Sequence, residues 1–149
     1  MLKGIDPRIS PDLLYTLALM GHGDELVIVD RNYPAYSGPD RVHRLDGVDA
    51  VTAARAVLTL LPLDTFIDSP VERMEPVGEP GLVTSVQEEF HAVAQLAAGR
   101  RFPLGSVDRT AFYERARSAF AVLATGEDRP YGCFILTKGV LPEFAPAAG

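Results

Sequence analysis

The spacing of apolar residues predicts helices and strands that follow one another along the chain. Between residues 13 and 20 apolar side chains recur at helical spacing, after a Ser-Pro-Asp sequence at 10–12 that is typical of a helix start. Gly21 marks the end of this helix. The run Leu26-Val27-Ile28-Val29 is continuous rather than alternating, which indicates a strand buried on both faces.

The same pattern continues to the end of the chain. A helix starts after Asp49 and ends near Pro62, and another starts at a Ser-Val-Gln-Glu capping box over residues 85–88. We expect a last helix over 111–120, started by Asp108 or Thr110, and strands at 41–45, 121–125 and 134–136. The segment 65–76 is strand-like in part and is interrupted by Pro70.

This alternation of strands and helices predicts one α/β domain with a mostly parallel sheet. The low-complexity end of the chain, over residues 143–149, is predicted to be a flexible tail. A length of 149 residues and a hydrophobic content of 47% are enough for one domain with a core.

Composition excludes several classes of function. The net charge is −6 without a basic run, so nucleic-acid binding is not expected, and no apolar run approaches the roughly 20 residues that cross a bilayer. The start of the chain does not resemble a signal peptide, and a single cysteine suits the reducing cytoplasm. No metal-ligand spacing is present, and the absence of GxGxxG and Walker A motifs removes the simplest nucleotide sites.

His22 is the first candidate for chemistry, because it lies between Gly21 and Gly23 in a tight turn. An imidazole can give and take a proton near neutral pH. A carboxylate at Asp24 or Glu25 could orient the ring. The alternatives remain open: a histidine in a loop without a chemical role, beside solvated turn charges.

Other candidates come from positions near strand and helix ends. Asp30 follows the buried strand, at the edge where α/β proteins bind ligands, but its carboxylate could equally cap the next loop. Arg109 could serve a ligand hydroxyl or an acidic neighbour. Tyr131 is either a functional hydroxyl or a packing aromatic, and Cys133 is most typical of a small core residue. The two remaining histidines, His43 and His91, are interpreted as solvated or structural.

The motifs, taken in order, resemble those of the family of ribose pyranase and L-fucose mutarotase, and they lie closer to the fucose branch. The resemblance extends from about residue 2 to residue 141. The matching segments are Ser10–Leu14, Met20–Glu25, Asp30 with Asn32–Ala35, Asp46-Gly47, Leu61–Asp64, Phe112–Ala116, Thr125–Glu127, Tyr131-Gly132 and Lys138–Val140.

This resemblance implies a Rossmann-like domain of three layers over residues 1–142, assembled into a ring-shaped homo-oligomer, often a decamer, with sites near subunit contacts. The implied enzyme needs no cofactor or metal and interconverts the cyclic forms of a free monosaccharide, with fucose, ribose and galactose as candidates. His22 corresponds to the catalytic proton donor of the family. Asp30, Arg109 and Tyr131 correspond to sugar-binding positions.

Cys133 departs from the family pattern, in which asparagine commonly follows Tyr-Gly. A thiol forms weaker hydrogen bonds than an amide, so the identity of the sugar stays open, although Cys133 is expected beside it. Ribose pyranase activity, a non-catalytic sugar-binding module and a structural ring component are the alternatives to a fucose mutarotase.

Overall fold

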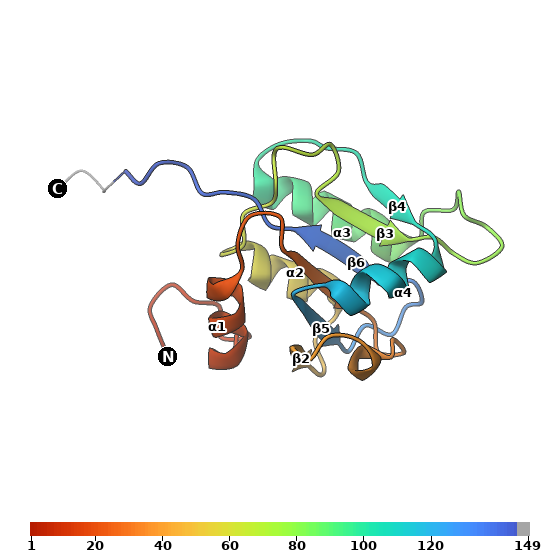
Figure 1. Ribbon diagram of the computed structural model, residues 1–149, viewed down its shortest axis with the longest axis horizontal. Coiled ribbons are helices and arrows are strands. Elements are labelled where there is room, and N and C mark those ends of the chain that lie inside the picture. Colours follow the sequence, from red (N-terminus) through yellow and green to blue (C-terminus); the bar gives the residue numbers. More distant parts are fainter. Residues whose placement is uncertain (146–149) are drawn as a thin grey trace.

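The computed structural model describes residues 1–145 and contains a six-stranded sheet in the order β2-β5-β1-β6-β3-β4 (Figure 1). The strands are β1 Glu25–Val29, β2 Val42–Leu45, β3 Val71–Met74, β4 Gly105–Val107, β5 Ala121–Thr125 and β6 Phe134–Thr137. The helices are α1 Pro11–Leu19, α2 Ala50–Leu58, α3 Ser85–Ala98 and α4 Arg109–Ser118, with a short 3-10 turn, η1, at Ala35–Ser37.

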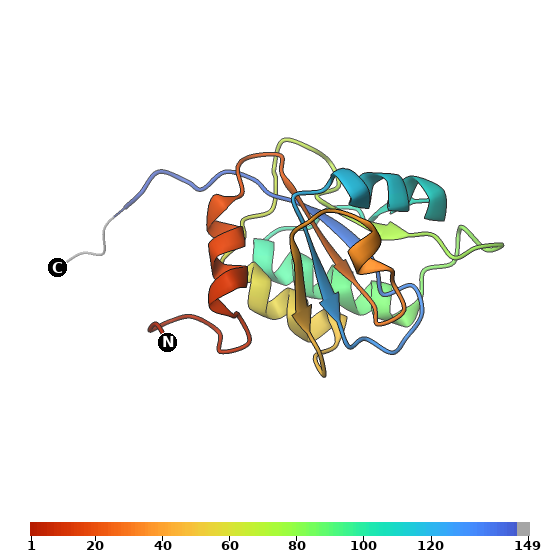
Figure 2. The same ribbon diagram turned by 60° about the horizontal axis from the view of Figure 1, so that its bottom comes forward.

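Strand β1 lies in the interior of the sheet, and its four residues from 26 to 29 are fully buried. Leu26 and Ile28 contact the core under α1, α2 and α3, whereas Val27 and Val29 contact the core under α4. Figure 2 shows α4 on one face of the sheet and α2 and α3 on the other. The continuous apolar run therefore identified a strand covered on both faces, as predicted.

The predicted sheet was mostly parallel, and β6 is the strand that departs from the common direction. β6 runs antiparallel to both neighbours, β1 and β3, while the other pairs are parallel. A parallel connection needs a crossover of a dozen or more residues, and the segment 126–133 that precedes β6 is shorter than that. The sheet is consequently mixed, and its strand order also differs from the doubly wound order of dinucleotide-binding domains.

The predicted helix starts are confirmed, except for the start of α3. The hydroxyl of Ser10 accepts the Leu13 N–H at 3.1 Å, and Asp49 and Asp108 cap α2 and α4 in the same way. In α3 the cap is Thr84 rather than Ser85, so the third helical residue is Gln87 and not Glu88. β3 begins directly after Pro70, and β4 was missed because a three-residue strand has too little pattern to be recognised.

The chain end beyond β6 forms no helix or strand through residue 145, and the remainder of the predicted tail, 146–149, lies outside the described residues. Within residues 1–145, no helix is long and apolar enough to cross a membrane.

Phe90 on α3 stacks on Phe134 of β6, with 3.7 Å between ring centroids and both side chains fully buried. We expect Phe90→Ala to lower the free energy of unfolding by about 3–5 kcal/mol, because it leaves a cavity between helix and sheet. Denaturant unfolding at fixed protein concentration measures this. Leu96→Ala, on the same helix but 84% exposed, should change stability by less than about 0.5 kcal/mol. Equal losses in the two variants would contradict this description of the core.

Candidate active site

A hollow of about 230 Å³ opens at the carboxyl end of β1 and brings together four of the predicted site residues. Its lining includes Asp30, Arg109, Tyr131 and Cys133, which come from separate parts of the chain. The other lining residues are Asn32, Tyr33, Met74, Tyr113 and Pro130. Its volume is below the roughly 300–1,000 Å³ of drug-sized sites, so it suits a small molecule.

Asp30 is the buried acidic group of this hollow, with 7% of its surface exposed. One carboxylate oxygen accepts the Asn32 N–H at 3.0 Å, so the loop-capping role considered from sequence is real. The other oxygen accepts from the Cys133 thiol, with Sγ 3.4 Å away. Each oxygen thus has one partner within the chain and keeps a second lone pair that can accept from a ligand.

Tyr131 has a φ of +62°, the left-handed region that residues other than glycine rarely adopt. Its hydroxyl accepts the Val77 N–H at 3.0 Å, so the ring bridges to the loop between β3 and α3. The next residue must be glycine, because a Cβ at Gly132 would lie 2.8 Å from Cγ of Glu127. This turn is held in an unusual conformation beside the hollow, as functional turns often are.

The opposite wall carries a cation and two phenols. Arg109 is the first residue of α4, and its guanidinium lies 4.9 Å from the ring centre of Tyr113, a cation–π distance. Tyr33 lies against Tyr113, with ring centres 5.2 Å apart. Burial raises the pKa of Tyr33 well above its ordinary value, so its hydroxyl stays protonated. The hollow therefore offers a carboxylate, a guanidinium and phenolic hydroxyls.

His22 lies at the other end of β1 and pairs with a residue that the sequence analysis did not assign to the site. Its Nε2 is 3.1 Å from Oδ1 of Asp64, a carboxylate that is 3% exposed. Asp24 instead accepts the Gly21 N–H at 2.7 Å, and Glu25 pairs with Arg115. Of the alternatives left open by the sequence, orientation of His22 by Asp24 or Glu25 is therefore not the one that the structure shows.

The environment of Asp64 favours its charged form. Burial opposes ionisation, but the hydrogen bonds from the Phe66 N–H and from His22 outweigh it, and the pKa of Asp64 is lower than its ordinary value. An ionised carboxylate only accepts, so His22 donates through Nε2 and leaves Nδ1 to exchange a proton with a ligand. Close packing supports this pair, since a Cβ at Gly139 would lie 2.8 Å from Cα of Asp64.

Within one chain His22 and the hollow are separate. β1 has five residues, so at about 3.3 Å per residue roughly 17 Å of strand lies between His22 and Asp30. The fold thus brings Asp30, Arg109, Tyr131 and Cys133 together and places His22 at the opposite end of β1.

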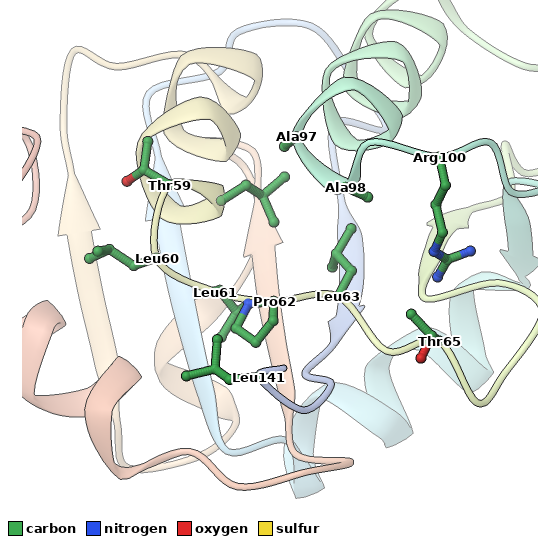
Figure 3. A pocket seen from close by; sticks show the side chains of 11 residues that line it. Thr59, Leu60, Leu61, Pro62, Leu63, Thr65, Ala97, Ala98, Arg100 and Leu141 are labelled. Atoms are coloured by element: carbon green, nitrogen blue, oxygen red, sulfur yellow. The ribbon is translucent and has the colours of Figure 1, made fainter. Parts of the chain in front are cut away.

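A second hollow, of about 310 Å³, lies near the His22 end and is mostly apolar (Figure 3). It is lined by leucines from the segment after α2, by alanines at the end of α3 and by Leu141. Arg100 is its one ionisable lining residue, and this guanidinium donates to the carbonyl of Asp64 at 2.6 Å. A pocket with so few polar groups lacks the acids and bases that proton transfer requires.

The other two histidines are structural, as predicted. His43 lies 2.7 Å from the Thr16 hydroxyl, and Nε2 of His91 lies 2.7 Å from the carbonyl oxygen of Phe102. Sequence reasoning missed the roles of Asp64, Tyr33 and Tyr113. All three lie in segments that carry the family resemblance, and that resemblance was the available signal.

The hollow has the chemistry of a binding site for a small molecule rich in hydroxyl groups, because charged and phenolic groups bind such ligands through directed hydrogen bonds. The chain belongs to the RbsD / FucU transport protein family, whose sequence profile matches residues 3–141. The family resemblance predicted from the sequence is confirmed.

Three similar proteins place the chain within this family. The fucose mutarotase of Homo sapiens is 49% identical over 147 residues, which is 94% of each chain. A fucose mutarotase from Streptococcus pneumoniae, solved in complex with L-fucose, superposes with a TM-score of 0.83 at 37% identity, over 95% of this chain and 100% of that one. Bacillus subtilis RbsD complexed with D-ribose is 22% identical, with a TM-score of 0.67 over 95% and 99%, and shares the fold.

The lowered pKa of Asp64 predicts a pH dependence of stability. Its charged form stabilises the folded state above the ordinary carboxyl pKa, and this contribution is lost as the pH falls through the lower folded value. We expect the free energy of unfolding of the wild type to fall below about pH 4 and Asp64→Asn to fall less steeply. Urea unfolding between about pH 2.5 and pH 7 measures both curves. Parallel curves would rule out this role for Asp64.

The Cys133 thiol should resist modification in the folded protein. Burial, and then the neighbouring Asp30 carboxylate, raise the pKa of Cys133 well above its ordinary value, so the thiolate is scarce and inaccessible. Alkylation by iodoacetamide, followed by mass spectrometry, should be at least about a hundredfold slower than in guanidinium-unfolded protein. Equal rates in the two states would show that the thiol is open to solvent.

Proposed function

We propose that this protein interconverts the α and β anomers of a free monosaccharide and that L-fucose is its substrate. The observation that carries the proposal is the convergence of Asp30, Arg109 and Tyr131 on one small hollow. The similarity to proteins named fucose mutarotase, one of them in complex with L-fucose, supports the choice of sugar. The likeness to the ribose complex supports only the common fold, so ribose pyranase activity is the weaker alternative.

The reaction requires proton transfer at two oxygen atoms. Opening a cyclic hemiacetal takes a proton to the ring oxygen and removes one from the anomeric hydroxyl, after which the first carbon–carbon bond rotates and the ring closes again. A well-placed acid–base group contributes about 10²–10⁴-fold to such a step. His22 is the proposed proton carrier, with Asp64 holding its ring. Asp30 and Arg109 would bind sugar hydroxyls, and Tyr131 would hold a hydroxyl or relay a proton.

The separation of His22 from the hollow leads to the proposal that two copies of the chain complete each site. One copy supplies the hollow with Asp30, and a neighbouring copy supplies His22. A contact between the two opposite ends of β1 in neighbouring copies is head-to-tail, and such contacts form a ring when the rotation from copy to copy closes. This supports the homo-oligomeric ring expected from the family resemblance.

Exposed apolar side chains around His22 support burial of this edge by a second copy. Phe66, whose ring centre is 5.1 Å from that of His22, is 72% exposed, and Ile67 is 42% exposed. Val140 and Leu141, on the segment after β6, are 50% and 72% exposed. Apolar residues gathered in this way mark interaction surfaces on soluble proteins.

Cys133 has a modified role in this proposal. It lines the hollow, but its thiol is directed to Asp30, so we assign it to orienting that carboxylate as well as to contacting the sugar. Its free, buried thiol also fits the reducing cytoplasm as the proposed compartment.

Saturation-transfer NMR between the anomeric signals of L-fucose tests the activity, with galactose and ribose as comparison sugars. We expect His22→Ala to slow enzyme-dependent exchange by about 10²–10⁴-fold, because the proton carrier is lost. The matched control is His43→Ala, which removes a histidine that contacts Thr16 and does not line the hollow, and it should keep most of the activity. Sugar binding without faster exchange by the wild type would favour the non-catalytic binding module instead.

Mixed oligomers test whether a site is shared between copies. His22→Ala and Asp30→Asn should each be inactive alone. After unfolding and refolding together in equal amounts, about a quarter of the sites should combine an intact His22 with an intact Asp30, because copies assort at random in a ring. Recovery of about a quarter of wild-type activity is the expected result. No recovery, with oligomers of the wild-type size, would place both residues in one chain's site.

A further inference from the structure

We propose that Gln87, a fully buried residue outside the hollow, is the positioning residue that holds Tyr131 in its binding conformation. The inference rests on the proposed function of Tyr131 and adds a residue to it. Gln87 is the third residue of α3 and is 0% exposed. It does not line the hollow itself, but it forms hydrogen bonds to two residues that do.

The side-chain amide of Gln87 is hydrogen-bonded on both sides. Its oxygen accepts the Thr84 N–H at 3.1 Å and a guanidinium N–H of Arg73 at 3.4 Å. Its nitrogen donates to the carbonyl of Met74 at 2.8 Å and to the carbonyl of Tyr131 at 3.1 Å. Met74 and Tyr131 both line the hollow, so one amide joins two of its walls.

Arg73 determines which way this amide faces. Its side chain is 5% exposed and donates to the carbonyls of Pro80 at 2.9 Å and Leu82 at 3.1 Å, besides Gln87. A guanidinium has no acceptor, so the oxygen of the amide must face it and the nitrogen must face the two carbonyls. The orientation of the amide therefore follows from the chemistry of its partners.

Tyr131 needs this support because its backbone is in the left-handed region, a conformation that is unfavourable for a residue with a side chain. Gln87 holds its carbonyl and the Val77 N–H donates to its hydroxyl, so the residue is held at both ends. Loss of the Gln87 donor would release the carbonyl and let the hydroxyl leave Val77. The contact with Val77 thus reports on the position of Tyr131 without any sugar present.

Gln87→Glu separates positioning from packing. Glutamate has nearly the same shape and keeps the acceptor for Thr84 and Arg73, but it places an oxygen against the two carbonyls and removes both donors. We expect KM for L-fucose to rise about tenfold with kcat within about twofold of the wild type. A variant that is only less stable would contain fewer active molecules, which lowers apparent kcat and leaves KM unchanged.

Hydrogen–deuterium exchange of peptides covering residues 75–79 provides a readout that needs no activity. Val77 should exchange about tenfold faster in Gln87→Glu, to the same extent as in Tyr131→Phe, because both lose the bond to the hydroxyl. Gln95→Glu is the matched control, because Gln95 is on the same helix. Its side-chain oxygen accepts the Phe102 N–H at 3.0 Å, and neither residue lines the hollow. It should change neither KM nor exchange at Val77.

The outcomes separate this inference from the proposed function. A rise in KM together with faster exchange at Val77 supports it, and the absence of either in folded Gln87→Glu overturns it. If that variant does not fold, Gln87→Met removes the donors without adding charge; because it also removes the acceptor for Thr84 and Arg73, its KM and its exchange at Val77 are compared with those of Thr84→Ala, which leaves the donors in place. Wild-type protein that does not speed anomer exchange overturns the proposed function, and exchange at Val77 then decides by itself whether Gln87 holds Tyr131.

Discussion

The burial of β1 on both faces is the constraint on which the arrangement of the molecule depends. Leu26 to Val29 are fully buried between two cores, so an extended strand separates His22 before it from Asp30 after it. Neither end can fold back toward the other without exposing that apolar surface. The two polar groups that the sequence places eight positions apart are thereby held at opposite ends of this strand.

Local features of the fold could be read from the sequence, whereas features that depend on distant contacts could not. The caps at Ser10, Asp49 and Asp108 and the strand before Asp30 depend on neighbouring residues, and the pattern identified them. The position of β6 between β1 and β3 depends on distant contacts, which no periodicity records. The shifted start of α3 is instead a local feature that was misassigned, because Thr84 and Gln87 have the same capping-box spacing one residue earlier than Ser85 and Glu88.

The residues of the candidate site show the same difference between local features and distant contacts. Asp30, Arg109 and Tyr131 were identified by their places at element ends and by the family resemblance, and the fold gathers them as expected. The partner of His22 could not be identified, because Asp64 is 42 residues away in sequence and reaches it through packing against Gly139. Nearby carboxylates were the natural choice from sequence, but each is engaged by another group.

Buried polar side chains hold the loops around the hollow. Glu127, 1% exposed, accepts from Arg129 at 3.1 Å and lies 3.4 Å from the Ala50 N–H at the start of α2. Burial alone would disfavour its charge, but the bonds from Arg129 dominate, and the pKa of Glu127 is lower than its ordinary value. Together with Gln87 it fixes both ends of the turn that carries Tyr131. This turn owes its shape to satisfied polar groups rather than to an apolar core.

The placement of His22 and Asp30 at opposite ends of one strand also has a genetic consequence. On the proposed arrangement, a copy that lacks His22 disables a site whose remaining residues belong to its intact neighbour. Its own hollow is completed by the copy on its other side, so each altered copy disables one site and activity falls only in proportion to the altered copies. Two alleles with defects at opposite ends of the strand, one in His22 and one in Asp30, would then partly complement each other in the same cell, as a consequence of the length of a single buried strand.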